Sequence, residues 1–506
     1  MAERDGARAS MRRRSVLVIG AGVGGITAAI HLARAGLDVT VLEKNAEAGG
    51  RCGRLVHGGH RFDTGPTLLV MPLLYEAEFG ALGVALDEAL QLRRVDPTYE
   101  LVFDDGSRLA LTSDMAAMRE QLEAIEPGSF AGFLRYLAEG GRHYDIGVAG
   151  LVGRDFRRIA DVLDPATLAA VLRVKPLVNH YRHMADFFAA PRLKSAFTFQ
   201  DLYMGLSPYA APATFSMLPY TELAHGVWYP VGGMYRVVET LMATAEDAGI
   251  AFRFETAVRS IEASGSRARG VVLDDGTRLG ADVVLANADL PYVYRDLLPA
   301  DRDAPKLWRK EFSCSTVNFL WGVDRTYEAL GAHTLFLADD DRANFEAISR
   351  DLGLAANASV YVHVPARLDA SMAPPGADTI TAIVPVGHLG DDDRRDAPDL
   401  RERAREQVLR RLAAIGITDL EAHITFEATL TPQWWAARYN LARGATHGLS
   451  HRLSQMAWFR PANRHRRYRN LYFAGASTRP GTGLPTAMVS GRLVAQRIVA
   501  ELAVQA

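Results

Sequence analysis

The spacing of apolar residues changes several times along this chain, and the changes predict its elements. Residues 15–19 form a short β-branched apolar run, and residues 26–35 place apolar side chains at helical spacing without Gly or Pro. A second apolar run follows at 38–43. The pattern predicts a strand, a tight turn, a helix and another strand, which is the beginning of a parallel βαβ unit.

The middle of the chain has a different character. From residue 114 to about 194 the apolar positions keep a helical period with few turn residues, which predicts a helical insert. Within it, residues 151–194 carry eight Arg or Lys and four Asp between apolar groups. Two interpretations are open: helices that lie on an anionic bilayer, or amphipathic helices that pack on the core and expose a basic face.

Strand and helix signals alternate again after residue 230. A helix is predicted at 237–248, a strand at 251–256, a hairpin that turns at Asp275-Gly276, and a buried strand at 282–287. These short elements are typical of a second portion of a nucleotide-binding fold.

Residues from about 299 to 432 mix strands with one long helix. Strands are predicted at 359–364 and 379–384, and the helix at 399–415. This mixture suits a substrate domain that contains a sheet. A last helix is predicted at 485–500.

Together the segments predict an α/β fold whose Rossmann-type nucleotide-binding domain is assembled from discontinuous pieces at 11–100, 226–298 and 431–506. Residues 101–225 are expected to hold the helical insert, including the part that would face a membrane, and the beginning of a mixed α+β substrate domain. Residues 299–430 are expected to hold the sheet-containing part of that domain.

Composition narrows the classes of function. The chain has 506 residues, of which 48% are hydrophobic, so it can bury a large core. A net charge of −2 gives no basic field for nucleic acid, and no Cys or His spacing indicates a metal site. Cys52 and Cys314 are the two cysteines, which favours a reducing compartment and leaves one disulfide open.

No targeting signal is predicted from the sequence, and this favours the cytoplasm. The basic residues Arg12, Arg13 and Arg14 precede the first predicted strand rather than a cleavable apolar segment, so no signal peptide is predicted. No run of 18 or more apolar residues occurs, so no transmembrane helix is predicted. Attachment to a membrane surface stays open.

A Gly-rich turn carries the clearest chemistry. Gly20 allows a tight turn, Gly22 lets the backbone approach a pyrophosphate, and Gly25 lets helix and strand pack closely. Glu43 ends the next strand 18 residues after Gly25, the spacing that reaches the ribose hydroxyls of a dinucleotide. A second Gly-rich run, 475–483, is predicted to close the same site.

Motifs along nearly the whole chain, from about residue 16 to 498, resemble the FAD-dependent amine oxidase and carotenoid desaturase superfamily. In this order they are similar to the bacterial and fungal phytoene desaturases. The motifs are Val39-Thr-Val-Leu-Glu43-Lys44, Gly49-Gly50-Arg51, Phe62-Asp63-Thr64-Gly65-Pro66-Thr67, Tyr203-Met-Gly-Leu-Ser-Pro-Tyr209, Tyr220 to Pro230 with Gly232-Gly233, Asn287-Ala288-Asp289, Tyr361-Val-His-Val-Pro365, Gly448-Leu-Ser-His451 and Asn470 to Pro485.

The resemblance implies an FAD site. Glu43 would hold the adenosine ribose, Arg51 would neutralise the pyrophosphate, Val258 would present its backbone to the adenine, and the helix after Gly483 would face the flavin. Two alternatives stay open: a surface salt bridge for Arg51 and ordinary strand packing for Val258. The residues that the resemblance assigns to the cofactor are Gly20, Gly22, Gly25, Glu43, Lys44, Gly50, Arg51, Gly65, Pro66, Thr67, Val258, Asn287, Gly475, Thr482, Gly483 and Leu484.

The resemblance also implies a reaction, the conversion of phytoene to neurosporene or lycopene by hydride transfer to flavin and loss of a proton. Candidates for a base are Glu222, His225 and Asp201, each of which also suits a hydrogen-bonded core residue. Six aromatic residues either line a tunnel or fill the core: Tyr203, Tyr209, Phe215, Tyr220, Trp228 and Tyr229.

His447 departs from the expected pattern, because a small or aromatic residue is expected there. It faces either a polar chain end of the substrate, as in an oxygenated carotenoid, or the protein interior.

Several other functions stay open. They are a desaturase of diapocarotenoids or hydroxylated carotenoids, a carotenoid isomerase or saturase, a flavin amine oxidase, and a prenyl-lipid-binding protein without redox chemistry. The expected partners are a long-chain isoprenoid hydrocarbon, a membrane surface, quinone or oxygen as electron acceptor, and a second copy of the chain. We expect a cytoplasmic protein held peripherally on the cytoplasmic membrane.

Overall fold

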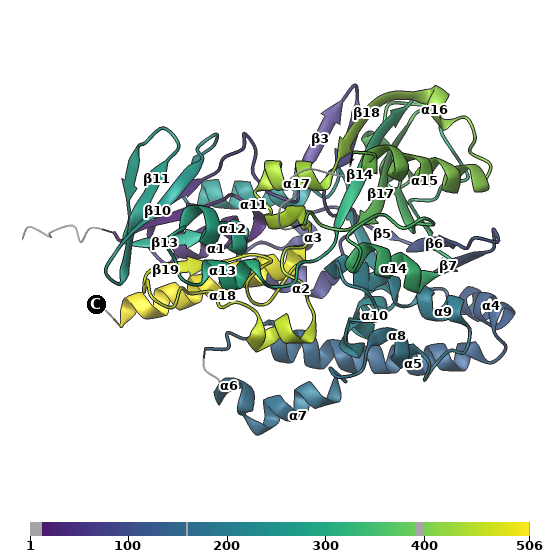
Figure 1. Ribbon diagram of the computed structural model, residues 1–506, viewed down its shortest axis with the longest axis horizontal. Coiled ribbons are helices and arrows are strands. Elements are labelled where there is room, and N and C mark those ends of the chain that lie inside the picture. Colours follow the sequence, from purple (N-terminus) through teal and green to yellow (C-terminus); the bar gives the residue numbers. More distant parts are fainter. Residues whose placement is uncertain (1–12, 158–159, 391–397, 505–506) are drawn as a thin grey trace, which may run out of the picture.

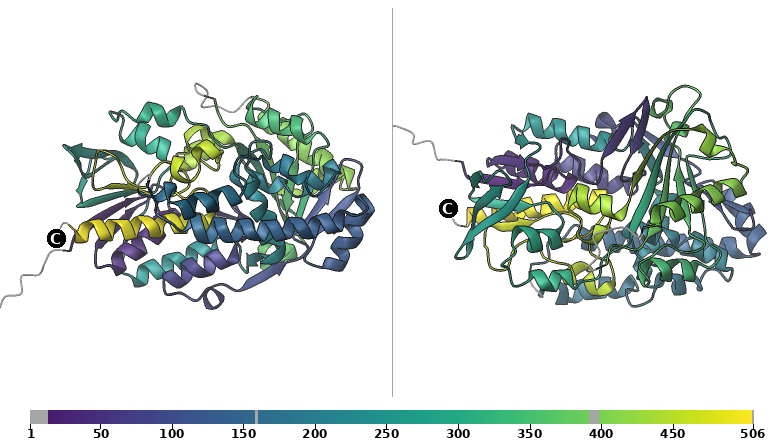
Figure 2. Two further views of the ribbon diagram at one scale, coloured as in Figure 1. Left: turned by 90° about the horizontal axis from the view of Figure 1, so that it is seen from below. Right: turned by 45° about the horizontal axis from the view of Figure 1, so that its top comes forward.

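A computed structural model describes residues 13–157, 160–390 and 398–504 of this protein (Figure 1). A parallel sheet with its helices forms the left half of Figure 1, and a mixed sheet forms the right half. Helices from the middle of the sequence, drawn in blue, extend below the right half, and the view from below in Figure 2 faces them.

The parallel sheet has five strands that come from distant parts of the chain. Their order is β19 (Leu471–Phe473), β13 (Val283–Ala286), β1 (Ser15–Ile19), β2 (Asp38–Leu42) and β9 (Ala251–Arg253). The strand order reverses beside β1, since β2 and β13 pair with it on opposite sides. In a sheet of this kind, ligands bind outside the carboxyl ends of the strands at this switch point.

Both faces of the parallel sheet are buried, which is why its strands are almost continuously apolar. Val16 and Val18 pack in one core cluster with α1 (Val23–Arg34), α11 (Arg236–Asp247) and α18 (Leu484–Ala503). Leu17 and Ile19 pack in another cluster on the opposite face. That face is covered by an antiparallel sheet of β10 (Val258–Ser264), β11 (Arg267–Leu273) and β12 (Arg278–Gly280).

The second large sheet has seven strands and is mixed. Its order is β18 (Ile424–Leu430), β14 (Ser315–Val323), β17 (Asp378–Val386), β16 (Val360–His363), β15 (His333–Phe336), β6 (Tyr99–Val102) and β7 (Arg108–Leu111). Apolar residues on one face of the sheet pack with α15 (Leu400–Ala414). Two further pairs of antiparallel strands are β3 (Arg54–His57) with β4 (His60–Asp63), and β5 (Leu92–Val95) with β8 (Val227–Pro230).

The helical interpretation of residues 114–194 is confirmed. The helices there are α4 (Met115–Ile125), α5 (Ser129–Tyr144), the π-helix Asp145–Val152, α6 (Ala160–Leu163), α7 (Pro165–Arg173), α8 (His180–Met184) and α9 (Pro191–Ala196). Three of these helices have an N-terminal side-chain cap: Asp114 caps α4, Asp164 caps α7 and Asn179 caps α8.

Further helices include α2 (Pro72–Ala81), α3 (Leu86–Ala89), the 3-10 helix Phe199–Met204, α10 (Met217–Ala224), α12 (Leu290–Tyr292), α13 (Ala304–Trp308), α14 (Asp341–Ser349), α16 (Leu420–His423) and α17 (Pro432–Tyr439).

Most predicted elements lie within a few residues of the observed ones. The strand expected at 251–256 is shorter, because Glu255 takes a positive φ of 52° and the chain leaves the sheet after Arg253. Cys52 and Cys314 are both buried free thiols, so the disulfide that the sequence left open is not formed.

The contact between α1 and α18 generates a prediction about stability. A Cβ at Gly491 of α18 would overlap the carbonyl oxygen of Gly24 and lie 3.0 Å from the backbone nitrogen of Ala28. Gly491→Ala should therefore lower the free energy of unfolding by about 1–3 kcal/mol, as overpacking does. Thermal unfolding of the variant measures the loss.

Gly80 supplies the matched control, since it lies within α2 and a Cβ there would meet no heavy atom within 4 Å. Gly80→Ala should raise stability by about 0.5–1 kcal/mol. An unfolding temperature for Gly491→Ala equal to or above that of the unchanged protein would contradict the packing argument.

Candidate active site

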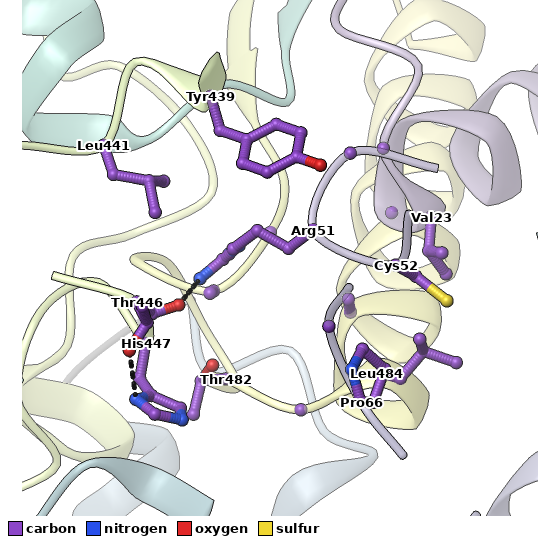
Figure 3. A pocket seen from close by; sticks show the side chains of 18 of the residues that line it. Val23, Arg51, Cys52, Pro66, Tyr439, Leu441, Thr446, His447, Thr482 and Leu484 are labelled. Atoms are coloured by element: carbon purple, nitrogen blue, oxygen red, sulfur yellow. Dashed lines mark hydrogen bonds between the residues drawn. The ribbon is translucent and has the colours of Figure 1, made fainter. Parts of the chain in front are cut away.

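A cavity of about 910 Å³ extends from the carboxyl edge of the parallel sheet to the seven-stranded sheet. Residues from both halves of the molecule line it, and Figure 3 shows the part around Arg51 and His447. One end is polar and rich in glycine, whereas the other is mostly apolar. The cavity therefore joins two sites of different chemistry.

The polar end is built where four parallel strands stop. Gly20 follows β1, Glu43 follows β2, Asn287 follows β13 and Gly475 follows β19 within two residues. All four line the cavity at the switch point of the sheet. This is the place where a doubly wound sheet binds a dinucleotide.

Glu43 is held in one orientation by the turn that it faces. One carboxylate oxygen accepts a hydrogen bond from the backbone nitrogen of Ala21 at 2.8 Å, and the other accepts two from Asn45 at 2.9 Å. The side chain is 6% exposed. A carboxylate has about four lone-pair directions, and three are used here, so this fixed group can still accept one hydroxyl of a ribose.

Asn287 fits between the glycines of the two Gly-rich runs. A Cβ at Gly22 would lie 2.8 Å from its side-chain oxygen, and one at Gly475 would lie 3.1 Å from its side-chain nitrogen. That nitrogen donates to the carbonyl of Ala474 at 3.1 Å. The glycines thus leave a cradle of backbone into which a pyrophosphate fits closely.

Gly25 is the one predicted cofactor residue that does not line the cavity. A Cβ there would overlap the carbonyl oxygen of Gly20 and lie 2.9 Å from the side chain of Asn287. Its small size lets α1 pack against the turn, which is the role that the motif predicts. The other fifteen predicted residues line the cavity: Gly20, Gly22, Glu43, Lys44, Gly50, Arg51, Gly65, Pro66, Thr67, Val258, Asn287, Gly475, Thr482, Gly483 and Leu484.

The strand packing of Val258 is observed, and its backbone contact with adenine stays a prediction. It is the first residue of β10 and packs in the core beneath the parallel sheet, and its neighbours Thr256 and Ala257 reach the cavity with it. Strand packing therefore does not exclude a contact with adenine.

Arg51 reaches into the cavity and makes one hydrogen bond there, from its guanidinium to the carbonyl of Thr446 at 2.7 Å (Figure 3). Among the described residues no carboxylate lies within ion-pair distance of it, so it is not the surface salt bridge that the sequence left open. Burial lowers its pKa, and the charge of Asp289 partly offsets this. A partly buried cation without a carboxylate partner would suit the pyrophosphate of a bound dinucleotide.

The long helix α18 begins at the cavity. Thr482, Gly483 and Leu484 line it, and the backbone nitrogen of Thr482 donates to the Nε2 of His451 at 3.0 Å. Because α18 has twenty residues, its first turn presents a partial positive charge. A ring that gains negative charge is stabilised at this position.

The apolar end is lined by aliphatic and aromatic side chains with a small group of tyrosines among them. Tyr99, Tyr203 and Tyr361 come from β6, a 3-10 helix and β16. The apolar lining residues include Met71, Leu74, Val148, Val152, Phe215, Met217, Leu218, Leu335, Ile383 and Met456. Such a wall recognises a ligand by shape and apolar contact.

The three predicted base candidates do not line the cavity. Asp201 is fully buried and its carboxylate lies 3.0 Å from the Nδ1 of His180. His225 contacts the hydroxyl of Thr221 at 3.1 Å and packs on Tyr144. Glu222 is separated from the cavity by Tyr203, which donates to it at 2.6 Å. The structure therefore corrects the expectation that these side chains meet the ligand directly.

The reason lies in α10, which turns Met217 and Leu218 toward the cavity and Glu222 toward the core. Of the six predicted aromatic residues, Tyr203 and Phe215 line the cavity, and the other four pack elsewhere: Tyr209, Tyr220, Trp228 and Tyr229.

His447 lines the cavity near Arg51, and its Nδ1 lies 3.1 Å from the hydroxyl of Thr446 (Figure 3). Burial, followed by the charge of Arg51, lowers the pKa of His447 to about 4, so the ring is neutral near pH 7. It therefore offers a hydrogen bond without a charge.

Sequence reasoning missed some residues of the site. Tyr99 lies on a strand with no motif, Tyr439 ends α17, and Asp289 and Thr446 lie in loops; these segments meet only in the fold. Tyr361 and Asp289 belong to motifs that carry the resemblance, but the resemblance assigned them no role. Those motifs are the signal in the sequence that could have identified these two residues.

The family model for flavin containing amine oxidoreductases matches residues 23–499. The chain belongs to this family, and FAD is the cofactor that its donor groups fit. Among solved structures, a putrescine oxidase with bound putrescine has a TM-score of 0.63 at 16% identity, covering 96% of this chain and 99% of that one. At this identity the likeness establishes the fold.

Curated relatives are more similar. A phytoene desaturase of Fusarium fujikuroi is 40% identical over 511 residues, which cover 96% of this chain and 89% of the relative. A zeta-carotene-forming phytoene desaturase of Myxococcus xanthus is 41% identical, covering 97% and 95%. A 4,4'-diapophytoene desaturase of Staphylococcus haemolyticus is 30% identical, covering 96% and 99%.

The unpaired charge of Arg51 generates a prediction about the cofactor. Arg51→Met should weaken FAD binding by about 10- to 100-fold, because a charge-assisted hydrogen bond contributes about 1.5–3 kcal/mol. Titration of the flavin-free protein with FAD, followed by flavin fluorescence, measures the dissociation constant.

Arg54 is the matched control. It lies three residues away on β3, is bound to Glu47 and Glu239, and does not line the cavity. Arg54→Met should bind FAD as the unchanged protein does. Equal affinity of the Arg51 and Arg54 variants would show that Arg51 does not contact the pyrophosphate.

Proposed function

We propose that this protein is an FAD-dependent carotenoid desaturase that converts phytoene to neurosporene or lycopene. The observation that carries the proposal is a single cavity in which a dinucleotide cradle continues into an apolar wall. Names of relatives at about 40% identity support the same substrate. One of these relatives is named as forming zeta-carotene rather than neurosporene or lycopene. The number of double bonds that this protein introduces is therefore part of the proposal.

Different residues would bind the hydrocarbon and the cofactor. A hydrocarbon has no polar group to bind, so the apolar wall must fix its position by contact alone. FAD, when bound, supplies the acceptor for the hydride. Glu43 and Arg51 would hold its nucleotide part, and Pro66, Thr67 and Leu484 would lie against the ring. The wall excludes water from the bond that reacts.

Amine oxidation fits the cavity less well. An amine substrate carries a charged ammonium, which needs a carboxylate or a polar cage when it is buried. The acidic residues that line the cavity lie at the nucleotide end, and they are Glu43, Asp274, Asp289 and Asp296. The arrangement of Glu43 and Arg51 likewise argues against a lipid carrier without flavin.

A carotenoid with a hydroxyl group is a second candidate substrate. His447 is neutral and lines the cavity, so it can exchange a hydrogen bond with a hydroxyl. A shorter diapocarotenoid is supported by the similarity to the diapophytoene desaturase.

We also propose that the protein docks on the cytoplasmic face of a membrane through α6, α7 and the loop after α7. Leu163, Leu172 and Leu177 are 62%, 60% and 81% exposed there. Arg173 is exposed among them and would meet anionic lipid, whereas Lys175 is paired with Glu139 at 2.7 Å. These helices extend below the molecule in Figure 1. In the part of the chain that the structure describes, no helix is long and apolar enough to cross a bilayer.

The proposed route from such a membrane begins beside α6. Val148 and Val152 line the apolar end of the cavity and belong to the π-helix that precedes α6. A hydrocarbon dissolved in the bilayer would thus enter between these helices. Quinone, which shares the bilayer, or oxygen would reoxidise the flavin.

The substrate is tested by expressing the chain in a colourless host that accumulates phytoene. Coloured carotenoids should appear, and the absorption spectrum of each separated pigment gives the number of conjugated double bonds. The Arg51→Met variant should form several-fold less pigment, because it binds less FAD. Unchanged phytoene beside flavin-loaded protein would refute the proposed substrate and direct the test to diapophytoene and hydroxylated carotenoids.

Membrane docking is tested by flotation with liposomes that contain anionic lipid. The double variant Leu172→Asp, Leu177→Asp should bind at least about tenfold more weakly, since each leucine contributes about 1.5–3 kcal/mol when buried. Val56→Asp is the control, because Val56 is 59% exposed on β3, outside the proposed surface. Equal flotation of both variants would exclude this surface.

A further inference from the structure

A chain of buried polar side chains lies behind the apolar wall. Tyr203 lines the cavity, and its hydroxyl donates to Glu222 at 2.6 Å. The other carboxylate oxygen of Glu222 accepts from the side-chain nitrogen of Gln200 at 3.1 Å. The hydroxyl of Tyr99 contacts that of Tyr203 from the opposite side. Glu222 and Gln200 are buried and do not line the cavity.

The hydroxyl of Tyr203 has one hydrogen and two lone pairs. Its hydrogen goes to Glu222, and Tyr99 can donate to one lone pair. One lone pair is left, and the side chain is partly accessible from the cavity. A buried acceptor in an apolar wall is costly unless something uses it.

The location of Tyr203 relates it to the expected place of the flavin. Thr67 contacts the hydroxyl of Tyr361 at 2.8 Å, and the ring of Tyr361 lies edge-on to that of Tyr99, 6.2 Å between centroids. Tyr99 in turn contacts Tyr203. The chain of contacts thus runs from the loop expected beside the flavin to the free lone pair.

We propose that Tyr203 accepts the proton that leaves the substrate in each desaturation step and passes its own proton to Glu222. This inference rests on the proposed function. One carbon–hydrogen bond of the substrate would break with its electron pair leaving as hydride, for which bound FAD would supply the acceptor and oxidant. On the neighbouring carbon a proton leaves to the oxygen of Tyr203, and the electron pair left behind forms the new double bond. The hydroxyl proton of Tyr203 moves to Glu222, which becomes neutral.

The surroundings of Glu222 suit this role. Burial raises its pKa to about 7, and the hydrogen bonds from Tyr203 and Gln200 limit the rise. The carboxylate is therefore a stronger base than an exposed one, and its neutral form is tolerated in the core.

The titratable groups that face Glu222 are the phenols of Tyr99 and Tyr203 and, from α5, that of Tyr136. Burial raises the pKa of all three well above the usual value, so they stay neutral at pH 7. Among the described residues no charged side chain contributes to the shift at Glu222. Glu222 acts through Tyr203, so it is a positioning and proton-storing residue.

The test follows anaerobic bleaching of the flavin band when the FAD-loaded protein meets phytoene in liposomes, which reports the reductive step alone. Tyr203→Phe should slow bleaching by about 100-fold or more, within the range of general base catalysis. In the unchanged protein the rate should fall as pH falls through about 7, because Glu222 loses its carboxylate form. Glu222→Gln should be slow and should lose this pH dependence.

Tyr136→Phe is the matched control, because Tyr136 is a buried phenol that donates to the carbonyl of Phe197 and does not line the cavity. It should keep the rate and the pH profile. A readout without flavin or turnover comes from infrared spectra of the flavin-free protein. The difference between the spectra of the unchanged protein and of Glu222→Gln should contain the carbonyl band of a protonated carboxyl that titrates near pH 7. The band of Asp341, whose pKa burial also raises to about 7, cancels in this difference.

The outcomes separate the two proposals. If phytoene bleaches the flavin and Tyr203→Phe matches Tyr136→Phe, the relay is wrong and the desaturase function stands. If Glu222→Gln keeps the pH profile, the relay is wrong even where Tyr203→Phe does not fold. If phytoene leaves the flavin of the unchanged protein oxidised, the proposed function fails and the relay fails with it.

Discussion

The site depends on the close contact between Asn287 and the glycines around it. Asn287 follows β13, and any side chain at Gly22 or Gly475 would collide with its amide. The same amide donates to Ala474 after β19. Three segments that are far apart in the sequence are thereby held at one edge of the parallel sheet. Without this contact the Gly-rich turn would have no opposite wall, and the dinucleotide cradle would stay open.

A buried arginine holds the opposite wall. Arg460 is 1% exposed and donates to the carbonyls of Leu449, Ser450, Gln455, Ala476 and Thr478. Burial lowers its pKa to about 9, which leaves the guanidinium charged at neutral pH. Its five donors suit carbonyl groups that no strand or helix would satisfy. The loop that precedes α18 is thus fixed at the place where the cofactor is expected.

The two halves of the cavity follow different physical rules. At the nucleotide end the ligand is charged, so recognition depends on one fixed carboxylate, one unpaired guanidinium and exposed backbone. At the other end the ligand is expected to be a hydrocarbon, so the wall is mostly apolar. Tyr99, Tyr203 and Tyr361 bring hydroxyls to this wall, and each hydroxyl has a hydrogen-bond partner. A polar group kept at such a place is a reason to look for chemistry.

The sequence by itself determined the nucleotide half, since its signals are local. A β-branched run followed by Gly20, Gly22 and Gly25 predicts one backbone path, and Glu43 follows at a fixed distance. The helical period of residues 114–194 likewise predicted helices there. The second Gly-rich run, 475–483, was likewise predicted to close the site, and resemblance added Arg51; Arg51, Gly475, Thr482 and Gly483 line the cavity.

Tertiary structure alone decided what surrounds the substrate. Tyr99, Tyr203 and Tyr361 come from three separate elements, and no spacing in the sequence relates them. The same holds for Glu222, because its residue type indicates a base, but only the rotation of α10 decides that it lies behind Tyr203. Local patterns record how a backbone turns, whereas a cavity wall depends on which faces of distant elements meet.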